Sequence, residues 1–301
     1  MKYIKISISD KVAVVELDRQ TKLNAFTRDM WREMRDALTT INRDAGVRAV
    51  VLVGNGRVFT SGVDVKDAMA AMDSISGKAK ADVDGDALQK NIQIRAYIEE
   101  FQEAITAIEK CAVPVIAALH GQVVGLGVDI ACACDIRYAA RSTRFSVKEV
   151  DLGLAADIGT LQRLPRITGN DGLVRELAYT GRVFGAAEAL QMGFLSGVSS
   201  ASTRMSAFHM AMYTATAIAE KSPVAVMSTK KILAYSRDHS VAEGLAYTAQ
   251  HNSVALQSGD VEVACVEEVI EYSHPGIECL EEDVVYMIDG NFELVNTDSA
   301  L

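Results

Sequence analysis

The sequence contains no long apolar run. No stretch of its 301 residues approaches the roughly 18 to 20 consecutive apolar residues of a membrane-spanning helix, so we expect no membrane segment or membrane partner. Polar and apolar residues alternate from Lys2 to Ser9, which is typical of a strand. Because this pattern starts so early, we expect no signal or transit peptide before the fold.

Positive charge is also scarce. Lys and Arg number 30 against 40 Asp and Glu, which gives a formal net charge of −10. An acidic surface repels phosphate backbones, so we do not expect nucleic acid as a partner. A small phosphorylated ligand would need a local cluster of donors.

Cysteines are few, and they lack the spacing of metal ligands. Cys132 and Cys134 lie in an apolar run and are expected to be small core residues. We therefore expect no metal site and a reducing compartment. The five cysteines stand at positions 111, 132, 134, 265 and 279.

The sequence does contain a repeated order of strands and helices. Thr27 is expected to cap the first helix, and residues 67–90 are expected to form a mobile loop or a loosely held helix. No sequence identity repeats at a fixed period, so the repeat is structural. Predicted strands are 2–9, 12–17, 49–53, 113–119 and 135–139, and predicted helices are 27–41, 92–108 and 127–133.

The second half of the sequence favours helices. Past Glu271 we expect an irregular extension. Together the patterns predict an α/β core in residues 1–200 and a helical C-terminal region in residues 201–301. The helices expected after Pro165 are 172–180, 186–192, 202–220, 223–235 and 240–256.

Two glycine-containing segments are candidate anion sites. Residues 59–66 (FTSGVDVK) end a strand at a glycine, where a backbone N–H can point at a ligand oxygen, although an ordinary strand-to-loop turn explains the same residues. In residues 121–129 (GQVVGLGVD), glycines lead into a helix whose N-terminal amides suit an oxyanion. The order of these glycines is not the dinucleotide-binding fingerprint. Asp129 is a candidate functional acid or a helix-capping carboxylate.

A third segment places two carboxylates in apolar surroundings. Glu149 and Asp157 lie among Val, Leu, Ala and Ile residues in residues 145–160. Desolvation would raise the pKa values of these side chains toward those of general acids and bases. Ion pairs with the nearby Lys148 and Arg163 would instead make both acids structural.

Together these segments resemble the enoyl-CoA hydratase/isomerase (crotonase) family. Residues 17–26 (LDRQTKLNAF) are similar to its early strand-and-loop motif, with Gln20 in place of a common proline. Residues 59–66 and 125–135 are similar to its two oxyanion segments, with Leu126 in place of the middle glycine. The resemblance covers about residues 5–260. It implies an α/β spiral of strand-strand-helix units with a helical C-terminal part, and assembly into trimers or hexamers through the C-terminal region.

The acidic residues indicate which subgroup of the family the sequence resembles. Hydratases carry a pair of glutamates where this chain has Asp129 and Glu149. Dienoyl-CoA isomerases carry an Asp, a Glu and a second Asp, which Asp129, Glu149 and Asp157 supply. Residues 148–157, 160–165 and 235–240 are also similar to that subgroup.

The resemblance implies conversion of a 3,5-dienoyl-CoA to a 2,4-dienoyl-CoA in fatty-acid β-oxidation. Glu149 would take the C2 proton and Asp157 would protonate C6, with Asp129 tuning Glu149. The N–H groups of Val63 and Leu126 would hold the dienolate oxygen. No metal or redox cofactor is implied, because CoA is part of the substrate. Residues expected to bind the substrate are Lys22, Leu23, Ser61, Gly62, Asp64, Val65 and Lys66.

Other functions remain open at this point. A 2-enoyl-CoA hydratase would need different acids at 129 and 157, and an RNA-binding, non-catalytic homologue would need a basic helix that the sequence lacks. A scaffold with relic acids is a third alternative. Ser299-Ala300-Leu301 resembles a peroxisomal import tripeptide without its usual basic middle residue, so we expect a peroxisome-like organelle or the cytoplasm.

Overall fold

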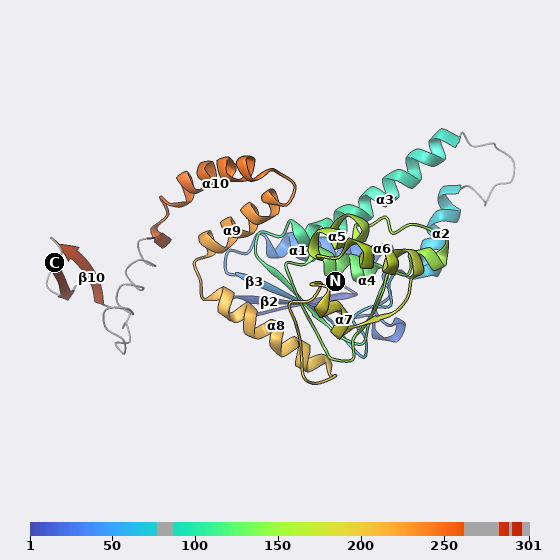
Figure 1. Ribbon diagram of the computed structural model, residues 1–301, viewed down its shortest axis with the longest axis horizontal. Coiled ribbons are helices and arrows are strands. Elements are labelled where there is room, and N and C mark those ends of the chain that lie inside the picture. The colour runs from blue at the N-terminus through green and yellow to red at the C-terminus, as the bar shows by residue number, and fades with distance from the viewer. Residues whose placement is uncertain (77–86, 262–282, 289–290, 297–301) are drawn as a thin grey trace. The chain divides into compact units, whose positions relative to one another are not determined.

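The computed structural model describes residues 1–76, 87–261, 283–288 and 291–296. The chain divides into two compact units, Met1–Lys230 and Lys231–Leu301. The first unit combines sheets and helices, and the three elements that follow β9 are the helices α8, α9 and α10. The predicted α/β fold with a helical C-terminal part is therefore confirmed (Figure 1). The strands are β1 (Ile4–Ser9), β2 (Val12–Leu17), β3 (Ala49–Gly54), β4 (Val115–Leu119), β5 (Gln122–Val124), β6 (Ile136–Ala139), β7 (Arg144–Ser146), β8 (Phe184–Gly185), β9 (Gly197–Val198), β10 (Asp283–Ile288) and β11 (Asn291–Asn296). The helices are η1 (Gln20–Lys22), α1 (Arg28–Ile41), α2 (Val65–Ser76), α3 (Ala87–Glu109), α4 (Leu126–Ala133), η2 (Glu149–Leu152), α5 (Thr160–Ile167), α6 (Asp171–Thr180), α7 (Ala186–Gln191), α8 (Arg204–Ala219), α9 (Pro223–Ser236) and α10 (Val241–Ala255), with η for 3₁₀ helices.

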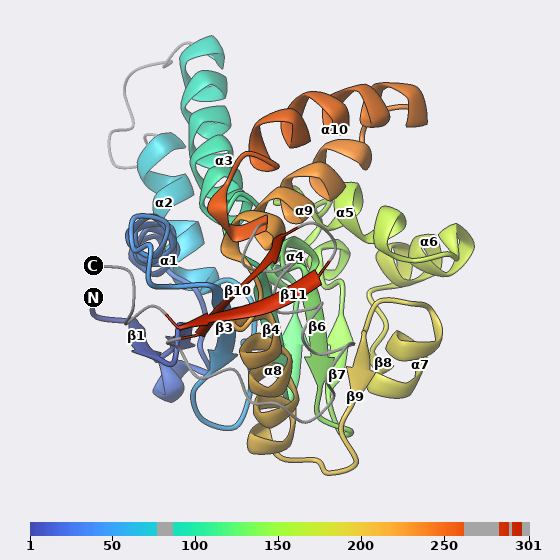
Figure 2. The same cartoon turned by 90° about the vertical axis from the view of Figure 1, so that its left-hand side faces the viewer.

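The larger sheet has six strands in the order β1-β2-β3-β4-β6-β9. β1 pairs antiparallel with β2 across a tight turn in which Asp10 and Lys11 both have positive φ, a backbone shape whose twist suits a hairpin. All other neighbours pair in parallel, and Figure 2 shows β3, β4 and β6 side by side. Parallel strands end at the same edge of a sheet, so the loops that follow them gather there.

A second sheet has three strands, and each of them comes from a different part of the chain after β4. Its order is β5-β7-β8, with β5 and β7 parallel. Two isolated parallel bridges, Phe26 with Val63 and Thr60 with Val123, extend it toward earlier turns of the chain. Strands β2, β3, β4 and β6 of the larger sheet are each followed by a contribution to the smaller one, as a spiral of strand-strand-helix units requires.

The larger sheet separates two apolar cores. In β3, Val50 and Leu52 face the main core, whereas Val51 and Val53 face α8, because side chains alternate along a strand. The side of α8 that meets the sheet carries a stripe of alanines, and small side chains let the helix approach closely. Although α8 lies after residue 200, it therefore packs within the first unit (Figure 1). The alanines of the stripe are Ala207, Ala211, Ala215 and Ala219.

Helices α1 and α3 pack together through aromatic side chains. Thr27 caps α1 as expected, since its side chain accepts a hydrogen bond from Met30 N. Trp31 is fully buried and stacks on Phe101 of α3 at a ring-centroid distance of 3.6 Å. This contact fixes α3, and α3 in turn contacts α4.

The structure refines or corrects the sequence predictions in several places, and short strands such as β8 and β9 were not predicted. Helix α5 begins at Thr160, before Pro165, and contains that proline in its second half. Within 67–90, α2 and the start of α3 are helical, and residues 77–86 lie outside the described residues. The tail expected to be irregular contains β10 and β11, which pair antiparallel, so that expectation is wrong for residues 283–288 and 291–296. The tripeptide 299–301 lies outside the described residues.

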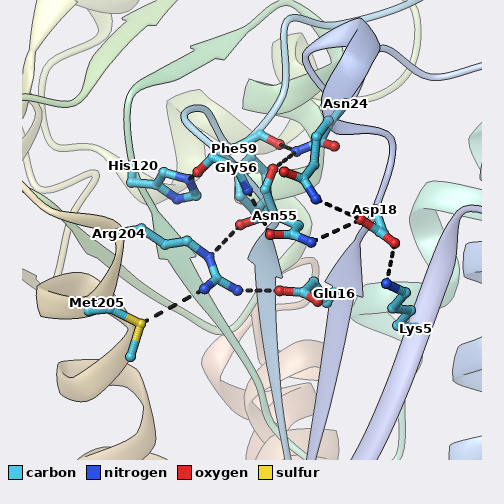
Figure 3. Close-up of polar contacts among 12 residues, drawn as sticks. Lys5, Glu16, Asp18, Asn24, Asn55, Gly56, Phe59, His120, Arg204 and Met205 are labelled. Atoms are coloured by element: carbon cyan, nitrogen blue, oxygen red, sulfur yellow. Dashed lines mark hydrogen bonds and ion pairs between the residues drawn. The ribbon is translucent and has the colours of Figure 1, made fainter.

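One buried asparagine joins the loop after β2 to the turn after β3. Asn24 is fully buried, and its Oδ1 accepts a hydrogen bond from Arg19 N at 2.9 Å. Its Nδ2 donates to the carbonyls of Asn55 at 2.8 Å and of Val58 and Phe59 at 3.1 Å each (Figure 3). Its φ of 52° is left-handed, a conformation that asparagine tolerates better than most residues. The two segments are therefore held together by a single side chain.

We predict that Asn24→Ala lowers the free energy of unfolding by about 3 kcal/mol, because it leaves several buried backbone groups without partners. Urea denaturation monitored by circular dichroism measures the loss. Asp10→Ala is the matched control, because Asp10 also has positive φ, at 49°, but lies in an exposed turn. An equal loss in both variants would assign the effect to the backbone conformation and not to the hydrogen bonds.

Candidate active site

The backbone N–H of Val63 is directed away from its bridge partner. Phe26 N donates to Gly62 O, and Asp64 N donates to Phe26 O, both at 2.8 Å. In such a parallel bridge, the residue between the two bonded neighbours points its own N–H to the opposite side. No described residue accepts a hydrogen bond from Val63 N.

The N–H of Leu126 is also available. Leu126 is the first residue of α4, where an amide has no partner within its own helix, and no described residue accepts a hydrogen bond from it. Gly62 lies next to it, because a Cβ placed on Gly62 would be 3.9 Å from Leu126 N. The two amides predicted to hold an oxyanion thus come from segments that meet.

The glycine before Leu126 is required by geometry. Gly125 has φ 52° and ψ −115°, a conformation that side chains disfavour. A Cβ at this position would lie 3.2 Å from Glu149 Oε1. The Glu149 carboxylate therefore lies against the turn that presents the Leu126 amide.

The side chain of Leu126 does not enter this space. It is 2% exposed and belongs to the main apolar core. Leucine in place of the usual glycine therefore fills the core, while its N–H stays at the helix N-terminus.

Glu149 is partly buried, and one of its two carboxylate oxygens lacks a hydrogen-bond partner among the described residues. It is the first residue of η2 and follows β7, whose partner β5 leads to Gly125. Burial raises the pKa of its carboxyl group to about 7, and the negative charges of Asp129 and Asp157 contribute to the rise. Its Oε2 is buried and has no hydrogen bond with any described residue. Such a carboxylate is suited to take up a proton near neutral pH.

Asp129 is held firmly by the neighbouring helix. It is 1% exposed, and its Oδ1 accepts hydrogen bonds from Thr160 N at 2.6 Å and Thr160 Oγ1 at 2.7 Å. Burial raises its pKa to about 6, although these hydrogen bonds act in the opposite direction. Asp129 therefore binds the N-terminus of α5 and does not cap its own helix α4, so the capping alternative is wrong.

Asp157 lies in a segment that α3 holds in place. It is an exposed residue whose carboxyl group is partly desolvated, which raises its pKa. Its backbone carbonyl accepts a hydrogen bond from Gln102 Nε2 at 2.6 Å. Farther along, Arg163 donates to Thr106 Oγ1 and to Glu109 Oε2, each at 3.0 Å. One face of α3 thus positions residues 157–163.

The cations near these acids are engaged elsewhere. Lys148 pairs with Asp151, and Arg163 pairs with Glu109 at 3.0 Å. No ion pair links Glu149 or Asp157 to a cation within the described ranges. The alternative in which Lys148 and Arg163 neutralise the two acids is therefore wrong.

A pocket of about 660 Å³ forms where the loop after β2 meets the turn after β3. It brings together Lys22 and Leu23, as expected, and adds Arg57. Lys22 and Arg57 are exposed and make no ion pair with the residues that the structure describes. The pocket is lined by Gln20, Thr21, Lys22, Leu23, Gly56 and Arg57.

The other residues expected to bind substrate do not line this pocket. Ser61 N donates to Leu23 O at 3.0 Å, which ties the oxyanion segment to the pocket loop. The Asp64 carboxylate pairs with Arg19 at 2.9 Å and accepts a hydrogen bond from Lys66 N at 3.2 Å, so it supports the start of α2. Those outside the lining are Ser61, Gly62, Asp64, Val65 and Lys66.

The described residues contain no cluster of three or more His, Cys, Asp or Glu that could hold a metal ion. None of the helices among them is long and apolar enough to span a membrane. Cys132 and Cys134 are buried free thiols in the core, as expected, and burial raises the pKa of Cys134 to about 12. These thiols are therefore protonated at neutral pH.

Three residues near the site, Thr160, Gln102 and Arg57, were not predicted as site residues from the sequence. Thr160 and Gln102 contact the acids across long sequence separations, so no local pattern identified them. Arg57 carried a signal, because it is a cation directly after the turn at Gly54-Asn55-Gly56.

The chain is similar to known proteins over most of its length. The Enoyl-CoA hydratase/isomerase family model matches residues 7–272. The mitochondrial Delta(3,5)-Delta(2,4)-dienoyl-CoA isomerase of Pongo abelii is 48% identical over 255 residues, which cover 85% of this chain and 75% of that protein. The peroxisomal protein of that name from Arabidopsis thaliana is 39% identical, with 88% and 92% covered. The crystal structure of an enoyl-CoA hydratase from Bacillus anthracis has a TM-score of 0.76 at 26% identity, with 90% and 96% covered. The chain belongs to the enoyl-CoA hydratase/isomerase family.

Proposed function

We propose that this chain is a Delta(3,5)-Delta(2,4)-dienoyl-CoA isomerase of fatty-acid β-oxidation. The observation that carries the proposal is the electrostatic coupling of Asp129, Glu149 and Asp157 beside the unbonded Leu126 amide. A shift of two conjugated double bonds needs proton transfer at both ends of the diene, and this group of acids supplies more than one carboxylate. The relatives from Pongo abelii and Arabidopsis thaliana carry that enzyme's name.

The proposed reaction begins at C2 of the thioester. The Glu149 carboxylate takes the C2 proton, and the electrons of that C–H bond move into the conjugated system to form a dienolate. The N–H groups of Val63 and Leu126 donate to its oxygen, which carries the developing charge. Asp157 then protonates C6, and the 3,5 double bonds become 2,4 double bonds. One proton passes from Glu149 to Asp157, directly or through water, and restores the enzyme.

The different surroundings of the two aspartates support this division of roles. Asp129 Oδ1 already accepts two hydrogen bonds from Thr160, and the residue is buried. We assign it to raising the pKa of Glu149 by its charge. Asp157 has no side-chain ion pair with described residues and is exposed, so a substrate can reach it.

We assign the CoA nucleotide to the pocket beside Lys22 and Arg57. Two cations without ion-pair partners at one pocket attract phosphate groups, even on a chain with a net charge of −10. Leu23 offers apolar surface to the adenine. Ser61, Gly62, Asp64, Val65 and Lys66 remain proposed contacts of the rest of the thioester.

The proposal also includes the assembly and the compartment. We propose a homotrimer or homohexamer formed through the C-terminal region, residues 201–301. A peroxisome-like organelle or the cytoplasm remains the proposed location. The reaction as written uses no cofactor, because both protons move through carboxylates.

The test of the function is turnover of 3,5-dienoyl-CoA, followed by absorbance, with 2-enoyl-CoA as the control substrate. We expect isomerisation of the first and little hydration of the second, because Asp129 replaces one glutamate of the hydratase pair. Hydration faster than isomerisation by an order of magnitude would contradict the proposal.

We predict that Asp157→Asn separates the two proton transfers. Asparagine keeps the size of the side chain but cannot give a proton to C6, whereas Glu149 can still take one from C2. Isomerisation should fall by roughly 10²- to 10⁴-fold, while C2 hydrogen still exchanges with deuterated solvent, as NMR can measure. Glu149→Gln is the control and should lose both. Near-normal isomerisation by a folded Asp157→Asn protein would make Asp157 structural.

We also predict a pH dependence of C2 exchange. Glu149 must be ionised to take the proton, and its pKa is raised to about 7, so it is protonated at lower pH. Exchange should fall about tenfold per pH unit below 7 and level off above it. Asp129→Asn keeps an acceptor for Thr160 but removes the negative charge that raises the pKa of Glu149. The fall in exchange at acidic pH should therefore begin at a lower pH in this variant. A fall that begins at the same pH would show that Asp129 does not tune Glu149.

A further inference from the structure

The turn after β3 is held by side chains from four separate segments. The Gly54 carbonyl accepts a hydrogen bond from Arg204 Nε at 2.8 Å, and the Asn55 carbonyl accepts one from Asn24 at 2.8 Å. The Gly56 carbonyl lies 3.1 Å from His120 Nε2. The Asn55 side chain accepts from Gly56 N and donates to Asp18 at 2.9 Å (Figure 3). These bonds pair the three carbonyls of the turn and fix the backbone shape of the pocket wall.

His120 makes one of these hydrogen bonds to the turn. It is 2% exposed, and burial lowers the pKa of its imidazole, so the ring is neutral near pH 7. A carbonyl can only accept, so the ring hydrogen is on Nε2, which donates to Gly56 O. Its Nδ1 is buried without a hydrogen bond to any described residue. The ring therefore donates a hydrogen bond from Nε2 to Gly56, a residue of the pocket lining.

Arg204 holds the same turn from the other side. It is the first residue of α8 and also pairs with Glu16 of β2 (Figure 3). The guanidinium thus spans from a strand to the Gly54 carbonyl. Neither Arg204 nor His120 lines the pocket, and neither belongs to the three-acid group.

We propose that His120 and Arg204 are positioning residues that set nucleotide affinity by fixing the turn that carries Gly56 and Arg57. Gly56 has a φ of 86°, a conformation that glycine adopts readily, and because glycine is also free to adopt others, the bonds from outside the turn select its shape. Releasing the Gly56 carbonyl lets the turn relax and moves Arg57 relative to Lys22 across the pocket. This inference rests on the proposed function, because it takes the pocket as the CoA nucleotide site.

The role predicts an effect confined to the nucleotide half of the substrate. A 3,5-dienoyl pantetheine thioester has the same reacting carbons as 3,5-dienoyl-CoA but lacks the nucleotide. Loosening the turn should therefore raise KM for the CoA thioester and leave the pantetheine thioester unchanged. General damage to the fold would change both substrates alike.

The experiment compares His120→Met with His120→Gln. The two side chains have nearly the same size and shape, but only glutamine can donate to Gly56 O. We expect His120→Met to raise KM for 3,5-dienoyl-CoA about tenfold with kcat within twofold, and His120→Gln to stay near wild type. No change in His120→Met, a fall in kcat, or an equal rise in KM for both thioesters would overturn the proposal.

A second variant decides the matter if His120→Met fails to fold. Arg204→Lys keeps a cation for Glu16 but loses the Nε donor to Gly54, and it should show the same selective rise in KM. If wild type turns over neither thioester, the proposed function fails, and calorimetric binding of free coenzyme A tests the positioning separately. Weaker binding by His120→Met but not by His120→Gln would support it, and equal binding by all three proteins would overturn it.

Discussion

The parallel pairing of the smaller sheet is the constraint on which the site depends. The bridges of Phe26 with Val63 and Thr60 with Val123, and the pairing of β5 with β7, align three successive turns of the chain. Each of these three segments then places one group of the proposed site at the same edge of the sheet. The groups are the Val63 amide, the Leu126 amide and the Glu149 carboxylate. A slip of one residue in any of these pairings would turn the corresponding group to the opposite side. The register of the sheet therefore sets the geometry of the chemistry.

The same arrangement places Glu149 in surroundings that oppose its charge. Raising the pKa of a glutamate from 4.5 to about 7 makes the ionised folded state less stable by roughly 3 kcal/mol. The folded state binds the proton more tightly than the unfolded chain, so this stability is present below pH 4.5 and is lost as the pH rises toward 7. The extensive apolar core on both faces of the larger sheet offsets that cost. The packing of the rest of the fold thus stabilises the protein enough to tolerate an ionised Glu149 in these surroundings.

Local patterns predicted much of this fold, and long-range contacts account for what they did not. The strand alternation in residues 2–17 and the capped helix after Thr27 were predictable because period and cap lie within a few residues. Strands of two or three residues, such as β8 and β9, carry too little sequence to show a period. The bond from Thr160 to Asp129 joins residues 31 positions apart, so only the folded chain reveals it. The glycines and acids of the site could be recognised together in the sequence. The residues that hold the acids in place, such as Thr160 and Gln102, could not.

Those supports explain why similar carboxylates can differ in role. Asp129 and Asp157 are the same residue type, and both have raised pKa values, yet one is locked against the N-terminus of α5 and the other is exposed. The two hydrogen bonds to Oδ1 hold the Asp129 carboxylate in one place, and its charge acts on its neighbour from there. Residue type alone therefore cannot distinguish the two aspartates; the hydrogen bonds made by Thr160 and the exposure of Asp157 support the proposed role of Asp157 as proton donor. The chemistry of the acids follows from how α3, α4 and α5 are packed against one another.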